Sequence, residues 1–188
     1  MKVDPAHFLV FAAIVAISLL IFLPKESASA GNFDPAVKLK FDLITNSMNV
    51  ACFGPSAILS MSDSGRLIGS CCGPMFLHKY AEQIEGLKKY SNIEEIPIDP
   101  YDIEVSQAKE LLSYLDSITL TSEEQSIYDE AMNMSDEGGP CCCKCWRWYV
   151  YEGLAKFLIR NYKFDSHQIA EVWDLSEGCG GDEHTEMH

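Results

Sequence analysis

The chain has 188 residues, with 28 acidic and 14 basic side chains and a formal net charge of −14. A chain this acidic repels nucleic acid and anionic lipid, so we expect no nucleic-acid partner. Its eight cysteines are too few for a small disulfide scaffold, in which about 8–10% of residues are cysteine.

The first thirty residues look like a targeting segment. Lys2 gives a basic start, 16 residues without charge run from Phe8 to Leu23, and Ala28-Ser29-Ala30 forms a small-residue cleavage pattern. This order is typical of a secretory signal peptide that is cut after Ala30. The apolar run is short of the ~20 residues of a spanning helix, but an uncleaved anchor helix stays open and would make the membrane a partner. Either alternative predicts an extracytoplasmic protein, secreted or anchored.

We expect residues 31–181 to form one helical domain that carries the cysteines, and residues 182–188 to form a disordered tail. Asp34-Pro35 can open a brief helix. Cys52-Phe53-Gly54-Pro55 and Cys71-Cys72-Gly73-Pro74 then repeat the pattern C-x-G-P. Proline suits the first position of a helix, so each of these segments is expected to lead into one.

Apolar residues at three- and four-residue spacing predict further helices. These cover residues 75–90, 105–116, a stretch after the capping box Thr121-x-x-Glu124 to about 134, residues 145–162 and residues 166–175. The helix over 145–162 is apolar on nearly all sides, which predicts that it is the central one. No alternating strand pattern is strong. The predicted fold class is therefore all-α, a small bundle of about five helices.

Six of the eight cysteines lie in two tight clusters, Cys71-Cys72 and Cys141-Cys142-Cys143-Lys144-Cys145. Clustered thiols are typical of ligands for a soft metal or of redox groups. The predicted ligands of a Cu(I) or Zn²⁺ ion are Cys71, Cys72, Cys141, Cys142, Cys143, Cys145, Cys179 and His78. Cys179 and Cys52 can reach the clusters if the bundle folds back, or they can form a structural disulfide.

Three features are expected to lower the pKa of these thiols. Both clusters precede a predicted helix, whose N-terminal dipole stabilises anions, and Lys144 and Arg147 add positive charge. Arg147 falls on the apolar side of its helix. It can point at neighbouring thiolates, or its stem can lie on the core while its head reaches water.

The segment 139–146 resembles bacterial and archaeal exported proteins of uncharacterised function that carry a PCYCGC motif. Pro140, Cys141, Cys143 and Cys145 match the motif, while Cys142 stands in place of its tyrosine and Lys144 in place of its glycine. The cysteine that follows a Trp-Asp pair in that family is similar in placement to Cys179, which follows Trp173-Asp174. The resemblance covers about the last fifty residues. It implies an exported, membrane-associated cysteine-motif protein and supplies no reaction.

Three functions are compatible with these patterns. The first is extracytoplasmic binding of a soft metal by clustered thiolates, and the second is thiol–disulfide exchange by the C-x-x-C pair Cys142 and Cys145. The third is a structural or interaction protein that disulfides hold together. The sequence has no nucleophile elbow, no H-E-x-x-H and no phosphate-binding glycine loop, so we assign no catalytic residue and favour a protein that is not an enzyme.

Overall fold

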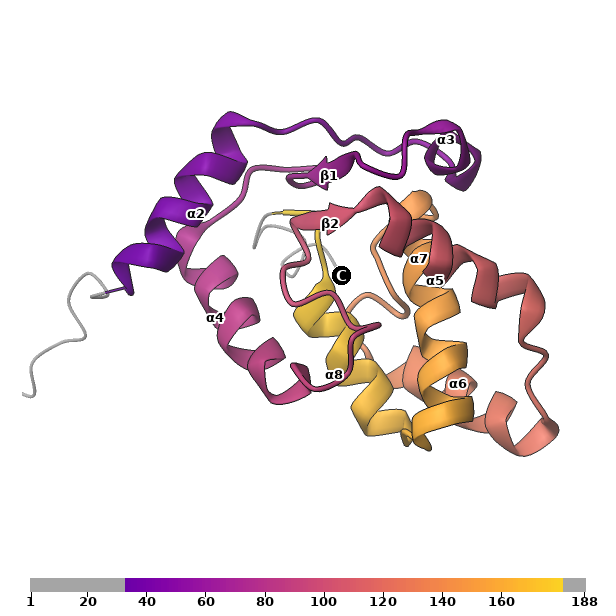
Figure 1. Ribbon diagram of the computed structural model, residues 1–188. Coiled ribbons are helices and arrows are strands. Elements are labelled where there is room, and N and C mark those ends of the chain that lie inside the picture. The colour runs from indigo at the N-terminus through magenta and orange to yellow at the C-terminus, as the bar shows by residue number, and fades with distance from the viewer. Residues whose placement is uncertain (1–32, 181–188) are drawn as a thin grey trace, which may run out of the picture. The chain divides into compact units, whose positions relative to one another are not determined.

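A computed structural model describes residues 33–180 of the chain, and these residues belong to one compact unit (Figure 1). Within these described residues there are seven α-helices and one two-stranded sheet. The helices are α2 (Pro35–Asn46), α3 (Pro55–Ser60), α4 (Leu77–Leu87), α5 (Val105–Ser117), α6 (Ser122–Met134), α7 (Trp146–Phe157) and α8 (Ser166–Ser176), and the strands are β1 (Arg66–Ile68) and β2 (Asp102–Glu104).

The mostly helical class is confirmed, but the expected number of helices is too low and the sheet was not foreseen. The predicted opening helix is a full helix, α2, and the first C-x-G-P segment leads into the short α3 with Pro55 in its first turn. Each strand has only three residues, which is too short for an alternating pattern to appear. The predicted signal peptide or anchor over residues 1–30 and the tail over 182–188 lie outside the described residues. In the described part, no helix is long and apolar enough to cross a membrane.

Four of the predicted helices agree closely with the structure, and the fifth begins later than expected. The capping box of Thr121 and Glu124 is present at the start of α6. A 3-10 turn, Lys88–Tyr90, extends α4, and a π-helical turn, Leu158–Tyr162, extends α7. However, α4 begins at Leu77 rather than directly after Pro74.

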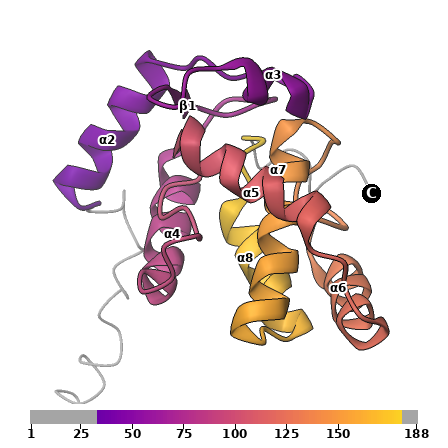
Figure 2. The ribbon, with the colours of Figure 1, turned by 45° about the vertical axis from the view of Figure 1, so that its right-hand side comes forward.

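The helix α7 is the centre of the core, as its apolar composition predicts. It packs along α5 (Figure 2), and most of its side chains are buried. Gly153 makes the close approach to α5 possible, because a Cβ atom there would lie 2.0 Å from the carbonyl oxygen of Leu111. Trp173 of α8 donates a hydrogen bond from its indole nitrogen to the carbonyl oxygen of Tyr151 (3.2 Å). The helices α5 and α8 therefore both hold α7 in place.

The small sheet positions the loops that carry Cys71 and Cys72. Strand β1 pairs antiparallel with β2, and Leu67 lies opposite Ile103. Asn49 extends the sheet with its side chain, since it donates to the carbonyl oxygen of Arg66 (2.9 Å) and accepts from the amide of Ile68 (2.8 Å). The chain leaves β1 at Ile68 and reaches the first cysteine cluster within three residues.

Candidate metal centre

All eight cysteines of the chain gather in one place, and all are free thiols. They come from four segments that are far apart in the sequence: Cys52 before α3, Cys71-Cys72 after β1, the segment 141–145 before α7, and Cys179 after α8. In Figures 1 and 2 the chain that follows α8 runs back toward β1 and β2. Cysteines that are far apart in the sequence therefore lie close together in the fold, as a shared metal site requires.

Backbone hydrogen bonds join two of these segments, the one with Cys71-Cys72 and the one with Cys179, without help from the sulfur atoms. The amide of Cys71 donates to the carbonyl oxygen of Gly178 (2.9 Å), and the amides of Cys72 and Gly73 donate to that of Cys179 (3.1 and 2.7 Å). A Cβ atom on Gly73 would lie 2.9 Å from the carbonyl oxygen of Gly180, so glycine is needed for this close contact.

A fourth backbone bond joins the other two segments to each other. The amide of Trp146, the first residue of α7, donates to the carbonyl oxygen of Phe53 (2.8 Å). The ring of Phe53 also stacks on the ring of Trp146, with centroids 6.1 Å apart. These contacts hold Cys52 next to the second cluster, so backbone bonds join the four segments in two pairs.

The outer sulfur atoms form one connected group. The Sγ atom of Cys52 lies 2.9 Å from that of Cys72 and 3.7 Å from that of Cys143. The Sγ atom of Cys72 also lies 4.0 Å from those of Cys142 and Cys143. Cys52 and Cys72 are exposed, while Cys142 and Cys143 are partly buried.

The inner sulfur atoms continue from this group into the protein. The Sγ atom of Cys179 lies 2.7 Å from that of Cys142 and 2.9 Å from that of Cys141. Cys141 in turn forms a hydrogen bond with Cys145, and Cys145 with Cys71. Cys141, Cys145 and Cys179 are buried, so the sulfurs form one continuous set from the surface to the core.

At least three sets of three sulfur atoms are close enough to share one ion each. In each set all ligand atoms lie within 4.8 Å of one another, and the sets are Cys52, Cys72 and Cys143; Cys72, Cys142 and Cys179; and Cys141, Cys142 and Cys143. Three sulfurs at ~2.3 Å from a common ion in a plane would be about 4.0 Å apart. The distances from Cys72 to Cys142 and Cys143 have this value. The cluster can therefore form a metal site.

The expectation that the thiols have lowered pKa values is wrong for most of them. The hydrogen bond that Cys71 donates to Cys145, together with burial, raises the pKa of Cys71, and the hydrogen bond that Cys145 donates to Cys141, together with burial, raises that of Cys145 to about 12. The hydrogen bond with Cys141 lowers the pKa of Cys179, but burial and the neighbouring thiol of Cys142 together outweigh it and raise this pKa to about 12. Crowded, buried thiols resist ionisation because each thiolate would repel the next.

The helix-dipole argument fails for the first cluster because α4 begins at Leu77, five residues after Cys72. Cys145 does lie at a helix N-terminus, as the N-cap of α7, and the backbone amide of Arg147 acts to lower its pKa, but the causes that raise this pKa are larger. The ammonium group of Lys144 lies over the ring of Trp148, with its Nζ atom 5.3 Å from the ring centre.

Arg147 is fully buried at the inner end of the sulfur cluster. Its guanidinium donates to the carbonyl oxygens of Pro100 (2.5 Å) and Gly69 (3.4 Å) and interacts with the thiols of Cys71 and Cys141. Its Nε atom has no hydrogen-bond partner. The alternative in which the guanidinium of Arg147 reaches water is wrong, because this group is buried beside the thiols.

Replacing Arg147 with methionine should weaken metal binding by about 10- to 100-fold, since a hydrogen bond to a charged group contributes about 1.5–3 kcal/mol. Methionine fills similar space but removes the positive charge that offsets the charge of the thiolates. The measurement is competition for Cu(I) against a chelator of known affinity, with circular dichroism to show that the helices remain. Arg147→Lys keeps the positive charge and should lose less affinity for Cu(I) than Arg147→Met. Equal affinities for wild type and Arg147→Met would contradict this role.

Two sequence-based assignments differ from the observed group. Cys52 was left outside the predicted ligand set, yet its sulfur contacts two others; the repeated C-x-G-P pattern was the signal that could have included it. His78 is exposed, packs near Phe76 with ring centroids 6.0 Å apart, and belongs to none of the three sets of ligand atoms found in residues 33–180. A ligand role for His78 stays a prediction.

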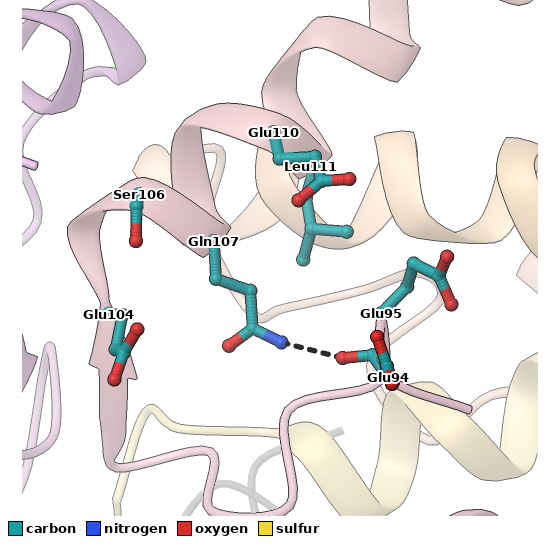
Figure 3. A pocket seen from close by; sticks show the side chains of 7 residues that line it. All are labelled: Glu94, Glu95, Glu104, Ser106, Gln107, Glu110 and Leu111. Atoms are coloured by element: carbon teal, nitrogen blue, oxygen red, sulfur yellow. Dashed lines mark hydrogen bonds between the residues drawn. The ribbon is translucent and has the colours of Figure 1, made fainter. Parts of the chain in front are cut away.

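A second candidate region in the described part of the chain is a surface cavity lined by acidic residues. Figure 3 shows the carboxylates of Glu94, Glu95, Glu104 and Glu110 around a space of about 360 Å³, where Gln107 donates to the backbone carbonyl of Glu94 (3.1 Å). None of its lining residues is a cysteine. Carboxylates are hard oxygen ligands, so this cavity cannot serve the same chemistry as the sulfur cluster.

Comparison of the chain with models of protein families, with curated proteins and with solved structures gave no match. The resemblance to the exported PCYCGC proteins is not tested by these comparisons. The geometry of the cysteines is therefore the basis for a functional assignment.

Proposed function

We propose that this protein binds soft metal ions through a polynuclear centre of cysteine thiolates, and that Cu(I) is the ion it holds. The single observation that carries the proposal is that all eight thiols, from four segments, form one connected set of close sulfur contacts. Thiolates are soft ligands that select Cu(I), Zn²⁺ and iron–sulfur clusters over hard cations.

The pattern of contacts favours metal ligation over four disulfides. In a set of disulfides each sulfur has one partner, but Cys179 lies within 3 Å of both Cys141 and Cys142. Cys52 likewise faces Cys72 and Cys143. A thiolate that bridges two metal ions has other ligand sulfurs of both ions near it, and Cys179 and Cys52 each have two sulfurs close by.

The coordination number favours Cu(I) over Zn²⁺. The close sets contain three sulfurs each, and Cu(I) accepts three thiolates in a plane, whereas structural Zn²⁺ sites take four tetrahedral ligands. The ligand set we propose comprises Cys52, Cys71, Cys72, Cys141, Cys142, Cys143, Cys145 and Cys179.

Thiol–disulfide exchange by Cys142 and Cys145 has less support. Cys142 contacts Cys179 and Cys72, while Cys145 contacts Cys141 and Cys71. Burial raises the pKa of Cys142, and that of Cys145 is raised to about 12. An exchange enzyme needs an attacking thiolate at neutral pH, so the environment of this pair suits that reaction poorly.

We further propose that the protein works outside the cytoplasm, because residues 1–30 have the order of a signal peptide or anchor. In an oxidising compartment free thiols form disulfides. Bound metal would keep eight neighbouring thiols from oxidising, so export and metal binding are consistent with each other.

The proposal is tested by anaerobic loading of the reduced protein with Cu(I) and, separately, with Zn²⁺. We expect several Cu(I) ions per chain by elemental analysis after desalting, and full protection of the eight thiols from alkylation. A protein that retains no Cu(I) and whose eight thiols all alkylate would contradict the proposal. Four disulfides mapped in protein isolated from its native compartment would favour the structural alternative.

A further inference from the structure

We infer that the outer trio Cys52, Cys72 and Cys143, of which Cys52 and Cys72 are exposed, is the loading site of the centre. There Cu(I) arrives as a complex with a small thiol and passes inward by thiolate exchange. This inference rests on the proposed function, because it assigns different tasks to the two ends of the same cluster.

The exposure of the cysteines falls from Cys52 and Cys72 to Cys141 and Cys179. Cys52 and Cys72 are exposed, Cys142 and Cys143 are partly buried, and Cys141 and Cys179 are buried. Arg147, which is fully buried, interacts with the thiol of Cys141 at the inner end. An ion carried by a thiol complex can therefore contact the outer trio first, and solvent does not reach the inner sulfurs.

The three sulfur sets overlap, which provides a path from the outer end to the inner end. Cys72 belongs to the outer trio and also to the set with Cys142 and Cys179. Cys142 and Cys143 belong as well to the set with Cys141. An ion can therefore move from one set to the next while it keeps at least one of its sulfur ligands, and no fully uncoordinated Cu(I) has to form.

The loading step balances without a redox partner. A sulfur–copper bond to the donor thiolate breaks as a bond to a cysteine sulfur forms, and copper remains Cu(I) throughout. Each cysteine thiol that binds loses its proton, and each donor thiolate that leaves takes one up. The inner transfers exchange one cysteine thiolate for another in the same way.

The backbone supports different tasks for the two ends. Cys52 lies in a surface segment that a single backbone bond, from Trp146 to Phe53, ties to α7. Cys179 lies in a segment whose carbonyl oxygen accepts two backbone hydrogen bonds, from Cys72 and Gly73. The outer sulfur can therefore adjust to an incoming complex more readily than the inner ones.

The test measures uptake from a Cu(I)–glutathione complex by stopped-flow absorbance of the thiolate-to-copper charge-transfer band, under anaerobic conditions. Cys52→Ser should slow the first uptake phase at least tenfold while most of the copper capacity remains. The matched control Cys145→Ser removes one sulfur at the buried end; it should lower capacity or affinity and leave the first phase within twofold of wild type. Equal first phases for wild type and Cys52→Ser would overturn the inference.

A second measurement uses the wild-type chain and so does not depend on the folding of a variant. One equivalent of Cu(I)–glutathione is added, and the thiols are pulse-alkylated at increasing times and identified by mass spectrometry. Cys52 and Cys72 should be protected at early times and become reactive again as Cys141 and Cys179 become protected. Constant reactivity of Cys52 while the inner thiols are protected from the start would overturn the inference, whereas failure of the wild type to bind any Cu(I) would overturn the proposed function itself.

Discussion

Replacing Cys142 with serine should lower the affinity for Cu(I) by more than about 100-fold and reduce the number of bound ions. Even groups that only orient a metal ligand contribute about 10- to 100-fold to affinity, and Cys142 is itself a predicted ligand. It belongs to two of the three sulfur sets. Its sulfur lies 2.7 Å from Cys179 and 4.0 Å from Cys72, so it joins the inner and outer parts of the cluster.

His78→Ala is the control for this prediction. His78 is exposed and lies outside the three sulfur sets found in the described residues, so its removal should leave both copper capacity and affinity near the wild-type values. Competition titration and elemental analysis of both variants measure these quantities. If His78→Ala lost as much affinity as Cys142→Ser, the histidine would be a ligand and the all-sulfur assignment would be wrong.

Replacing Gly153 with alanine should destabilise the metal-free protein by about 3 kcal/mol, at the upper end of the usual cost of overpacking. The new Cβ atom would lie 2.0 Å from the carbonyl oxygen of Leu111 and 3.3 Å from the amide nitrogen of Leu115. Both are backbone atoms of α5, so they cannot move aside as a side chain can. The two helices must separate, and the core around α7 must loosen.

Gly54→Ala is the matched control, because a Cβ atom at Gly54 would meet no atom within 4 Å. Gly54 is the N-cap of α3 with a φ of −77°, so alanine costs less than about 1 kcal/mol there. Urea unfolding of both variants under reducing conditions, followed by circular dichroism, gives the free energies. A Gly153→Ala midpoint equal to that of Gly54→Ala would show that the approach of α5 and α7 does not limit stability.

The sequence predicted the helices that carry long apolar stripes and missed the elements that lack one. The bounds of α5 and α8 follow from their stripes and caps, and the burial of α7 follows from its composition. Pro74 was misleading because its position after glycine is favourable for a helix start, yet the backbone of Gly73 is held by its bond to Cys179. Tertiary contacts of this kind leave no local pattern in the sequence.

The composition of the candidate site could be predicted largely from clustering, but its connectivity could not. Seven of the eight cysteines in the connected set belonged to the predicted ligand set. Cys52 joins them through the bond between Trp146 and Phe53, a contact between residues 93 positions apart. The raised pKa values of the thiols were also beyond local reasoning, because they depend on how many sulfurs converge and how deeply they are buried.

The most direct measurement is X-ray absorption spectroscopy at the copper edge of the anaerobically loaded protein. We predict a first shell of about three sulfur atoms per ion at ~2.3 Å, together with a copper–copper distance, since the sulfur sets share ligands. A first shell dominated by nitrogen or oxygen at ~2.0 Å, or isolated ions with no copper neighbour at full loading, would contradict a polynuclear thiolate centre.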